Sequence, residues 1–167
     1  SIFCGKVLEE LMKVGRVGIL ADYNEKKESP YFSLYNAESI INWLEEDGEL
    51  IEVHLIEETY VVGDDGEIEP ERRIRRCFLD EEGYYTVEVY RVSIIGGSNK
   101  NGMLATYQPL VFGSPLKEIP FTFINPNSLL SDVEKPPMLD IALMSLSVYR
   151  NSADLELSLH TTAISTP

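Results

Sequence analysis

The last thirty residues constrain the fold most, because they predict a helix that is apolar on two sides. After Pro136 and Pro137, apolar residues recur at spacings of three and four over residues 138–160. One stripe is Leu139, Ala142, Leu146, Tyr149 and Ala153, and the other is Ile141, Met144, Val148, Leu155 and Leu159. A surface helix normally has one apolar stripe and a polar back. We therefore expect this helix to pack against other protein on both sides, and residues 136–167 to be truncated from a longer protein.

The preceding residues, 1–135, predict one α+β domain. Residues 3–14 carry apolar side chains at helical spacing, and Gly15 is a typical residue just beyond a helix C-terminus. From Arg16 to Phe123 the period changes to two, which is typical of β-strands. The expected strands are residues 17–23, 30–35, 40–44, 50–62, 72–79, 84–94 and 119–124. The predicted fold is an N-terminal helix, an antiparallel, meander-rich sheet and a long C-terminal helix.

Two turns in the predicted meander suggest how its charges pair. The turns are Gly63–Gly66, with Asp65-Gly66 at its centre, and Asp80–Gly83. Pairing across Asp65-Gly66 places Glu58 opposite Arg73, and pairing across Asp80–Gly83 places Arg75 opposite Glu88. Opposite charges directly across two strands contribute roughly 0.2–1 kcal/mol. The arginines within residues 72–76 are the only basic cluster. We expect them to pair across strands, and a contact to another subunit is the alternative.

The overall charge excludes several classes of partner. The chain has 14 Lys and Arg against 28 Asp and Glu, a net charge of −14. Binding to nucleic-acid phosphates or to an anionic membrane needs clustered cations, so neither partner is expected. No apolar run reaches the ~20 residues of a membrane span, and neither end resembles a secretory signal. Cys4 and Cys77 both have apolar neighbours and are expected to be buried free thiols rather than a disulfide.

Local patterns that resemble chemical sites each lack an essential part. Gly97 and Gly102 have the spacing of a phosphate-binding loop, but Met103 and Leu104 stand where that loop needs Lys and Ser or Thr. The acidic segment Asp64–Glu71 lacks the alternating ligands of a calcium loop, so a solvated hairpin tip is expected.

The remaining candidates for catalysis are isolated residues. His54 is expected on the exposed face of a strand, and His160 lies at the end of the last helix. Cys77 has no histidine partner by pattern, and the sequence contains no Gly-x-Ser-x-Gly motif. We therefore expect no enzyme activity, and no metal or cofactor.

Several blocks of residues resemble a family of tailed-phage and prophage proteins. The first blocks are Gly15–Tyr23, Pro30–Tyr31 and Tyr35–Trp43. The later blocks, in the same order along the chain, are Ile119–Ile124, Pro137–Leu146, Tyr149–Asp154 and Leu159–His160. This family is catalogued as a phage domain of unknown function, and its members are similar to phage portal proteins. The resemblance covers most of the chain, except the loops at 45–75 and 93–115.

The resemblance implies a structural role in the virion. Portal proteins form a ring, usually of twelve subunits, at one capsid vertex. The terminase motor drives DNA through this ring, and the tail attaches to it. This chain corresponds to the outer wing and the start of the next helix, without stem, clip or channel. The implied partners are other copies of the chain, terminase, and capsid or tail-connector proteins. The implied location is the virion, or the bacterial cytoplasm during assembly and as a prophage product.

The residues expected to make contacts lie on the final helix. They are Tyr149, Arg150, Asp154, Leu155 and Leu159. An isolated domain cannot easily cover both apolar stripes in this part of the helix, and the i and i+4 spacing of Arg150 and Asp154 would let them orient a neighbouring subunit or segment. The alternative is that the helix folds back wholly onto its own sheet. A different class of function also stays open, a free-standing acidic α+β module that binds a regulatory partner or mimics nucleic acid. An enzyme that uses an acidic cluster is a third interpretation.

Overall fold

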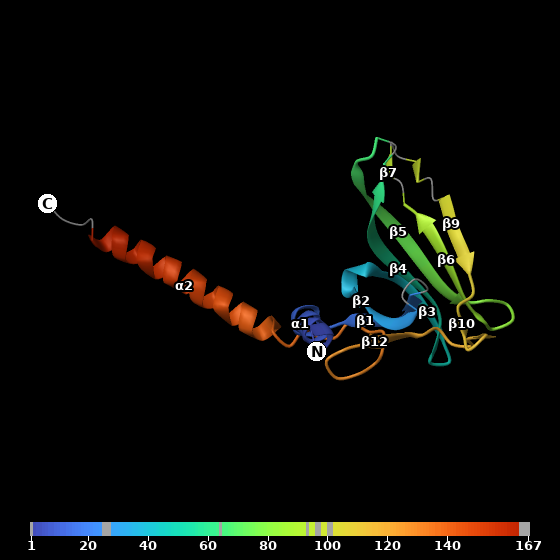
Figure 1. The fold of residues 1–167 in the computed structure, drawn as a ribbon. Coiled ribbons are helices and arrows are strands. Elements are labelled where there is room, and N and C mark those ends of the chain that lie inside the picture. The colour runs from blue at the N-terminus through green and yellow to red at the C-terminus, as the bar shows by residue number, and fades with distance from the viewer. Residues whose placement is uncertain are drawn as a thin grey trace. The chain divides into compact units, whose positions relative to one another are not determined.

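The chain is described by a computed structural model that covers residues 2–24, 28–63, 65–92, 94–95, 98–99 and 102–163 (Figure 1). Helix α1 (Ile2–Val14) is followed by a β-rich region and then by helix α2 (Leu139–Ala163). The neighbouring strands of the five-stranded sheet and of the two short hairpins are all antiparallel. The predicted α+β class, with its N-terminal helix, antiparallel meander and long C-terminal helix, is therefore confirmed.

The strands form two larger sheets and two short hairpins. The five-stranded sheet has the order β3 (Ile40–Glu46), β4 (Glu49–Val62), β5 (Ile68–Leu79), β6 (Tyr85–Arg91) and β9 (Gly102–Tyr107). The three-stranded sheet has the order β12 (Phe121–Ile124), β1 (Val17–Asn24) and β2 (Ser29–Asn36), and the short helix η1 (Ala37–Ser39) follows β2. The hairpins pair β7 (Ile94–Ile95) with β8 (Ser98–Asn99), and β10 (Leu110–Val111) with β11 (Ser114–Pro115).

The chain divides into two compact units, one made of Ser1–Val17 with Ile124–Pro167 and the other of Gly18–Phe123. We call them unit 1 and unit 2. In unit 1, α1 ends at Gly15, whose φ is +81° and whose amide donates to the carbonyl of Leu11 at 3.0 Å. A Cβ at Gly15 would lie 2.3 Å from the carbonyl oxygen of Glu134. Glycine is therefore needed at this position for both its backbone conformation and its close packing.

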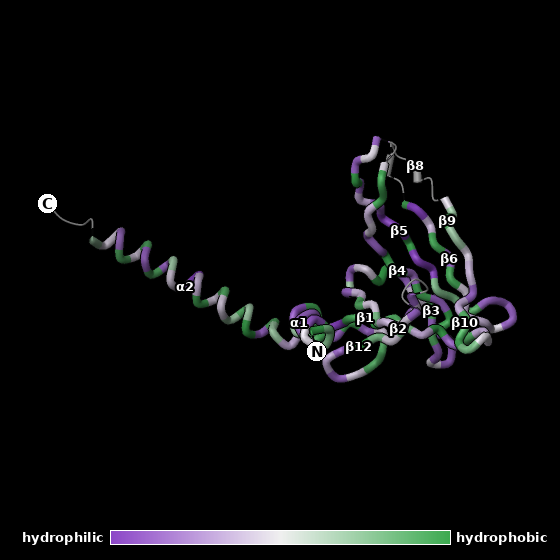
Figure 2. The backbone as a smooth tube through the Cα atoms, viewed as in Figure 1, coloured by the Kyte–Doolittle hydropathy of each residue, from purple (hydrophilic) through white to green (hydrophobic). Residues whose placement is uncertain are grey.

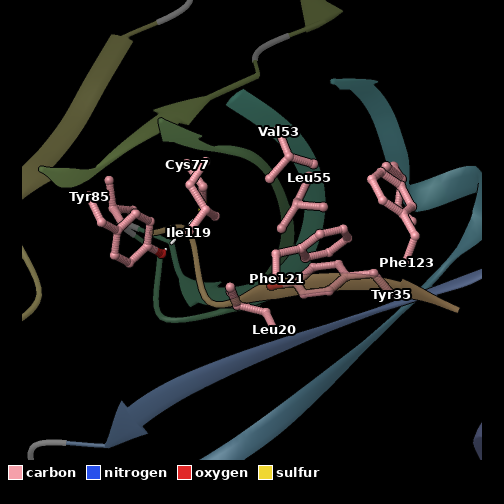
Figure 3. Packing of buried hydrophobic residues seen from close by; sticks show 11 residues of the cluster. Leu20, Tyr35, Val53, Leu55, Cys77, Tyr85, Ile119, Phe121 and Phe123 are labelled. Carbon is pink, nitrogen blue, oxygen red and sulfur yellow. Dashed lines mark hydrogen bonds between the residues drawn. The ribbon is translucent and has the colours of Figure 1, made fainter. Parts of the chain in front are cut away.

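The hydrophobic core lies in unit 2, and Figure 3 shows its side chains packed together. Val53, Cys77 and Val87 are directly opposite one another on β4, β5 and β6, and all three are fully buried. Aromatic rings from β12 also belong to this core, and the ring centroids of Phe121 and Phe123 lie 5.1 Å apart in an edge-to-face contact. Alternate residues of the strands therefore enter the core, as the period of two predicts.

Both predicted cross-strand pairs are wrong by one residue. Glu58 lies opposite Arg72 rather than Arg73, and Glu88 lies opposite Arg76 rather than Arg75. The reason is loop length: Val62 pairs with Ile68 and Leu79 pairs with Tyr85, so each loop holds five residues. The prediction assumed loops of two and four residues, which shift each register by one residue and place each predicted partner on the other face.

The segment between β6 and β12 differs most from the prediction. Strand β6 ends at Arg91, and the described residues that follow form strands β7 to β11 instead of one continuing strand and a loop. The predicted flexible loop Gly96–Gly102 lies largely outside the described residues, although Ser98 and Asn99 within it pair with Ile95 and Ile94. Strand β9 has no clear alternation in sequence because Leu104 is an extra, bulged residue between two pairs with β6.

Both cysteines are free, but only Cys77 is buried. The expectation of a buried thiol is wrong for Cys4. The partly buried positions of α1 include the apolar residues Phe3, Val7, Leu11 and Val14, at spacings of four, four and three, together with Glu10 and Met12, and Cys4 is not among them.

Candidate interaction surface

Helix α2 begins at Leu139, two residues after Pro137, and extends for 25 residues. The amide of Leu139 donates to the carbonyl of Pro136 at 3.0 Å, and the amide of Ala142 donates to that of Met138 at 3.0 Å. Asp140 lies in the first turn, where a carboxylate interacts favourably with the helix dipole. At a rise of 1.5 Å per residue the helix is about 38 Å long.

No residue of α2 is buried. Figure 2 shows hydrophobic and hydrophilic residues alternating along the whole helix. Ten large apolar side chains are exposed on it: Leu139, Ile141, Leu143, Met144, Leu146, Val148, Tyr149, Leu155, Leu157 and Leu159. Exposed apolar side chains that gather in number mark sites of interaction more often than single ones do.

The five residues predicted to make contacts all lie on this exposed helix. The side chains of Tyr149, Leu155 and Leu159 are 73%, 60% and 59% exposed. Arg150 and Asp154 are also exposed and are spaced by one helical turn. They place one charge of each sign beside the apolar side chains, so a partner that covers this surface meets both.

A second group of functional side chains, which the sequence analysis did not identify, surrounds Arg75 in unit 2. The Arg75 guanidinium lies 2.7 Å from the Asp22 carboxylate and 3.2 Å from that of Glu57, and it donates to the Tyr107 hydroxyl at 2.6 Å. The Tyr35 hydroxyl donates to Glu57 at 2.5 Å. We call these five residues the Arg75 cluster. They come from β1, β2, β4, β5 and β9, so the cluster joins the two larger sheets.

The electrostatics of the Arg75 cluster follow from its burial. The side chain of Arg75 is 10% exposed. Burial alone lowers the pKa of Arg75, but Glu57, Tyr107 and Asp22 outweigh it and raise that pKa, so the guanidinium stays charged. Burial, reinforced by the Glu57 carboxylate, raises the pKa of Tyr35 and keeps its phenol protonated as a donor. The two terminal nitrogens of Arg75 bind Glu57, Asp22 and Tyr107, whereas its buried Nε has no hydrogen-bond partner among the described residues. These contacts between strands of both sheets suit the cluster to holding the sheets together.

Arg72 and Arg76 pair with acidic residues across the sheet, as predicted, whereas Arg73 pairs with an acidic residue of its own strand. Arg72 lies 2.9 Å from Glu58, and Arg73 lies 2.5 Å from Glu71. Arg76 binds Glu52 at 2.7 Å and Glu88 at 3.1 Å, and its guanidinium stacks over the Phe78 ring at 4.2 Å.

Arg76 and Glu52 form a bidentate pair, in which two nitrogens of the guanidinium donate to the two carboxylate oxygens at 2.7 and 2.9 Å. Hydrogen bonds from Arg76 lower the pKa of Glu52 to about 2. His54 also contacts Glu52, at 2.5 Å, and lies on the face opposite the core, where it is partly exposed. His54 is therefore held in a surface network of charged side chains.

The described residues offer few other places for chemistry. Burial raises the pKa of Cys77 to about 11, and the nearest polar partner of its thiol is the Tyr85 hydroxyl, at 3.4 Å. Within the part of the chain that the structure describes, no group of three or more His, Cys, Asp or Glu could hold a metal ion. Asp64, at the start of the acidic segment considered for calcium, lies outside it. Among the same residues, no helix combines the length and apolar character needed to cross a membrane.

Comparison with protein families and with curated proteins identifies no relative of this chain. No family model matches this chain, and no curated protein matches it either. The exposed apolar surface of α2 is therefore the feature of the described chain that bears most directly on function.

Proposed function

We propose that this chain is a portal-like structural protein of a tailed phage, which contributes to the ring at the capsid vertex used for DNA packaging and tail attachment. Two sets of observations support the proposal. Residue blocks such as Tyr35–Trp43 and Tyr149–Asp154 resemble that family along most of the chain. In addition, the chain carries a large apolar surface that assembly would cover.

The single observation that carries the proposal is the exposure of α2. Fully burying one Leu, Ile, Val or Met side chain contributes about 1.5–3 kcal/mol, and ten large apolar side chains of this helix are exposed. The free energy available from burying the apolar side chains of α2 is therefore large compared with the free energy that burial of any one side chain contributes. A protein whose work is assembly uses such a surface.

The charge of the chain is consistent with the proposed place in the ring. A net charge of −14 repels DNA phosphates, so the chain suits the outer part of a portal, away from the DNA. The proposed partners are neighbouring copies, terminase, and capsid or tail-connector proteins. The proposed location is the virion, and the host cytoplasm during assembly.

The proposal is tested by replacing Leu155 and Leu159 together with Glu. Both side chains are exposed, so we expect the 167-residue chain to remain folded, as measured by circular dichroism and by the fluorescence of Trp43. We expect the whole protein, observed by negative-stain electron microscopy, to lose its rings. Ser152→Glu, at a polar position of the same helix, is the control that should keep them.

Two results would contradict the proposal. If the 167-residue chain unfolds on substitution, Leu155 and Leu159 belong to its own core and the helix says nothing about partners. If the whole protein forms no rings before any substitution, and its gene has no terminase and capsid genes beside it, the portal role is wrong.

A further inference from the structure

Two arginines stand directly opposite each other on neighbouring strands of the five-stranded sheet. Strands β5 and β6 lie side by side (Figure 1), and Arg73 of β5 pairs with Arg91 of β6. Like charges at directly opposite positions destabilise a sheet. The repulsion between these two guanidinium groups must therefore be offset by another group.

The buried carboxylate of Glu71 offsets part of this repulsion. Glu71 lies on the same face of β5 as Arg73, two positions before it, and diagonally across from Arg91. Its Oε1 accepts a hydrogen bond from Nε of Arg73 at 2.5 Å, and its Oε2 forms an ion pair with Nε of Arg91. The side chain of Glu71 is 7% exposed, and Glu71 is the only buried acidic residue among those that the structure describes. One buried carboxylate therefore holds two arginines in place and leaves one positive charge unbalanced.

The other acidic side chains close to this pair in the sheet are engaged elsewhere. Glu57 stands opposite Arg73 on β4, but its carboxylate belongs to the Arg75 cluster. Glu69 lies on the same face of β5, two positions before Glu71, and is exposed. A Cβ at Gly63 would lie 3.5 Å from Cδ of Glu69, so this carboxylate lies beside the turn between β4 and β5. Glu71 is therefore the carboxylate that the chain itself supplies to the two arginines.

The Nη groups of Arg73 and Arg91 remain available to a ligand. A guanidinium has five N–H donors, one on Nε and four on Nη. In both arginines Nε contacts Glu71, and none of the Nη nitrogens forms a hydrogen bond with the described part of the chain. By contrast, both Nη nitrogens of Arg75 and of Arg76 bind carboxylate or hydroxyl groups. The side chains of Arg73 and Arg91 are 32% and 52% exposed, so a ligand can reach them.

We propose that the Nη groups of Arg73 and Arg91 together bind an oxyanion, which is a carboxylate or phosphate group of a ligand. The planar donors of arginine match the oxygens of such a group, and hydrogen bonds between ions are stronger than those between neutral groups. A bound monoanion balances the positive charge that Glu71 leaves. The inference is independent of the proposed portal role, because it concerns unit 2 and not the exposed surface of α2.

The net charge of −14 weakens the binding of an anion but does not prevent it. At physiological ionic strength, exposed charges more than about 8 Å apart are largely screened from each other. The groups closest to the ligand therefore decide whether it binds, and these are two arginines and the one carboxylate that contacts both. We expect a dissociation constant in the millimolar range for a small anion, and tighter binding at low salt.

The test is a titration of the isotopically labelled 167-residue chain, followed by NMR through the Nε–H signals of its arginines. One titration uses inorganic phosphate, a second uses acetate, and sodium chloride at matched ionic strength is the reference. We expect at least one of the two oxyanions to shift the signals of Arg73 and Arg91 to saturation. The signal of Arg72, which pairs with Glu58, should stay unchanged.

The pattern of responses identifies the group that the site recognises. A response to phosphate alone assigns a phosphate group, a response to acetate alone assigns a carboxylate, and a response to both assigns oxyanions in general. If neither anion gives a saturable shift, or if Arg72 shifts like Arg73 and Arg91, the inference is wrong.

Two variants with matched exposure test the assignment to Arg91. Arg91→Gln removes one guanidinium, and Arg72→Gln is its control, because the two side chains are 52% and 50% exposed. Arg73 still binds Glu71 in Arg91→Gln, so the buried carboxylate keeps a cation and the circular dichroism spectrum should not change. Arg91→Gln should raise the dissociation constant by about tenfold or more, since hydrogen bonds to a charged group are lost. Arg72→Gln should leave it unchanged, and equal affinities of the two variants would overturn the inference.

A third variant separates the geometry of the donors from their charge. Arg91→Lys keeps the positive charge but lacks the planar set of donors, so it should also weaken binding. Full affinity in Arg91→Lys would show that charge alone attracts the anion, and the proposed recognition by paired guanidinium groups would be wrong.

Discussion

Replacing Arg75 with Met should destabilise unit 2 severely, because it leaves two carboxylates without their buried cation. Removing one partner of a buried ion pair costs about 3–5 kcal/mol. Asp22 is 16% exposed and Glu57 is 32% exposed, so water reaches Glu57 in part, and we expect about 3 kcal/mol. With a urea dependence of about 2 kcal/mol per molar for a domain of this size, the midpoint should fall by about 1.5 M.

Arg72→Met is the matched control on the same strand. Arg72 and its partner Glu58 are 50% and 70% exposed, and such surface pairs contribute little. We expect a loss below about 0.5 kcal/mol and a midpoint shift below about 0.3 M. Urea unfolding followed by Trp43 fluorescence measures both variants, because the single tryptophan packs against Phe123 within unit 2.

A second substitution identifies the cause of the loss. Asp22→Asn, added to Arg75→Met, removes one unpaired carboxylate and keeps an acceptor for the Tyr31 hydroxyl, so part of the stability should return. If Arg75→Met and Arg72→Met shift the midpoint equally, the cluster is hydrated like a surface ion pair. The argument that its burial makes it costly to break would then be wrong.

Three further predictions concern packing, pH and thiol reactivity. Gly18→Ala should lower the free energy of unfolding in urea by about 1–3 kcal/mol, because its Cβ would lie 2.2 Å from the Phe121 ring. Gly5→Ala has no atom within 4 Å of its Cβ and should stabilise α1 by about 0.5–1 kcal/mol. Equal effects of the two substitutions would contradict the packing argument. Glu52 has its pKa lowered from 4.5 to about 2, so its pairing stabilises the fold above pH 4.5 and is lost as the pH falls towards 2. Glu52→Gln should therefore lower the melting temperature at pH 7, by the equivalent of roughly 1 kcal/mol, and much less near pH 2; a constant difference would refute this. A thiol reagent should label only the exposed Cys4 in the folded protein and both cysteines in denaturant, and mass spectrometry measures the number of labels. A second label on the folded protein would contradict the burial of Cys77.

The sequence predicted the elements well because their periodicity is local. Residues 3–14 and 138–160 have helical spacing, and the long strands β4 and β5 alternate clearly, so these elements were found with small errors at their ends. Register was harder, because it depends on the number of residues in a loop. A loop of five residues cannot be distinguished from one of four or two by turn composition alone.

The Arg75 cluster was missed because its members are far apart in sequence. Asp22, Glu57 and Tyr107 are brought to Arg75 by the pairing of strands in two sheets, and no local pattern records this. One signal was available: Arg75 stands two positions before the buried Cys77, on the same face of β5.

The division of the chain into units has a consequence for how it folds. Unit 1 is built from two stretches separated by the 106 residues of Gly18–Phe123, and closing so long a loop in an unfolded chain costs about 4 kcal/mol of entropy. Most strands of unit 2 pair with a close sequence neighbour, so their contacts form without such closure. Because β1 and β12 are adjacent in one sheet, the folding of unit 2 brings the two stretches of unit 1 together. We therefore expect unit 1 to complete its structure only after the sheets of unit 2 have formed.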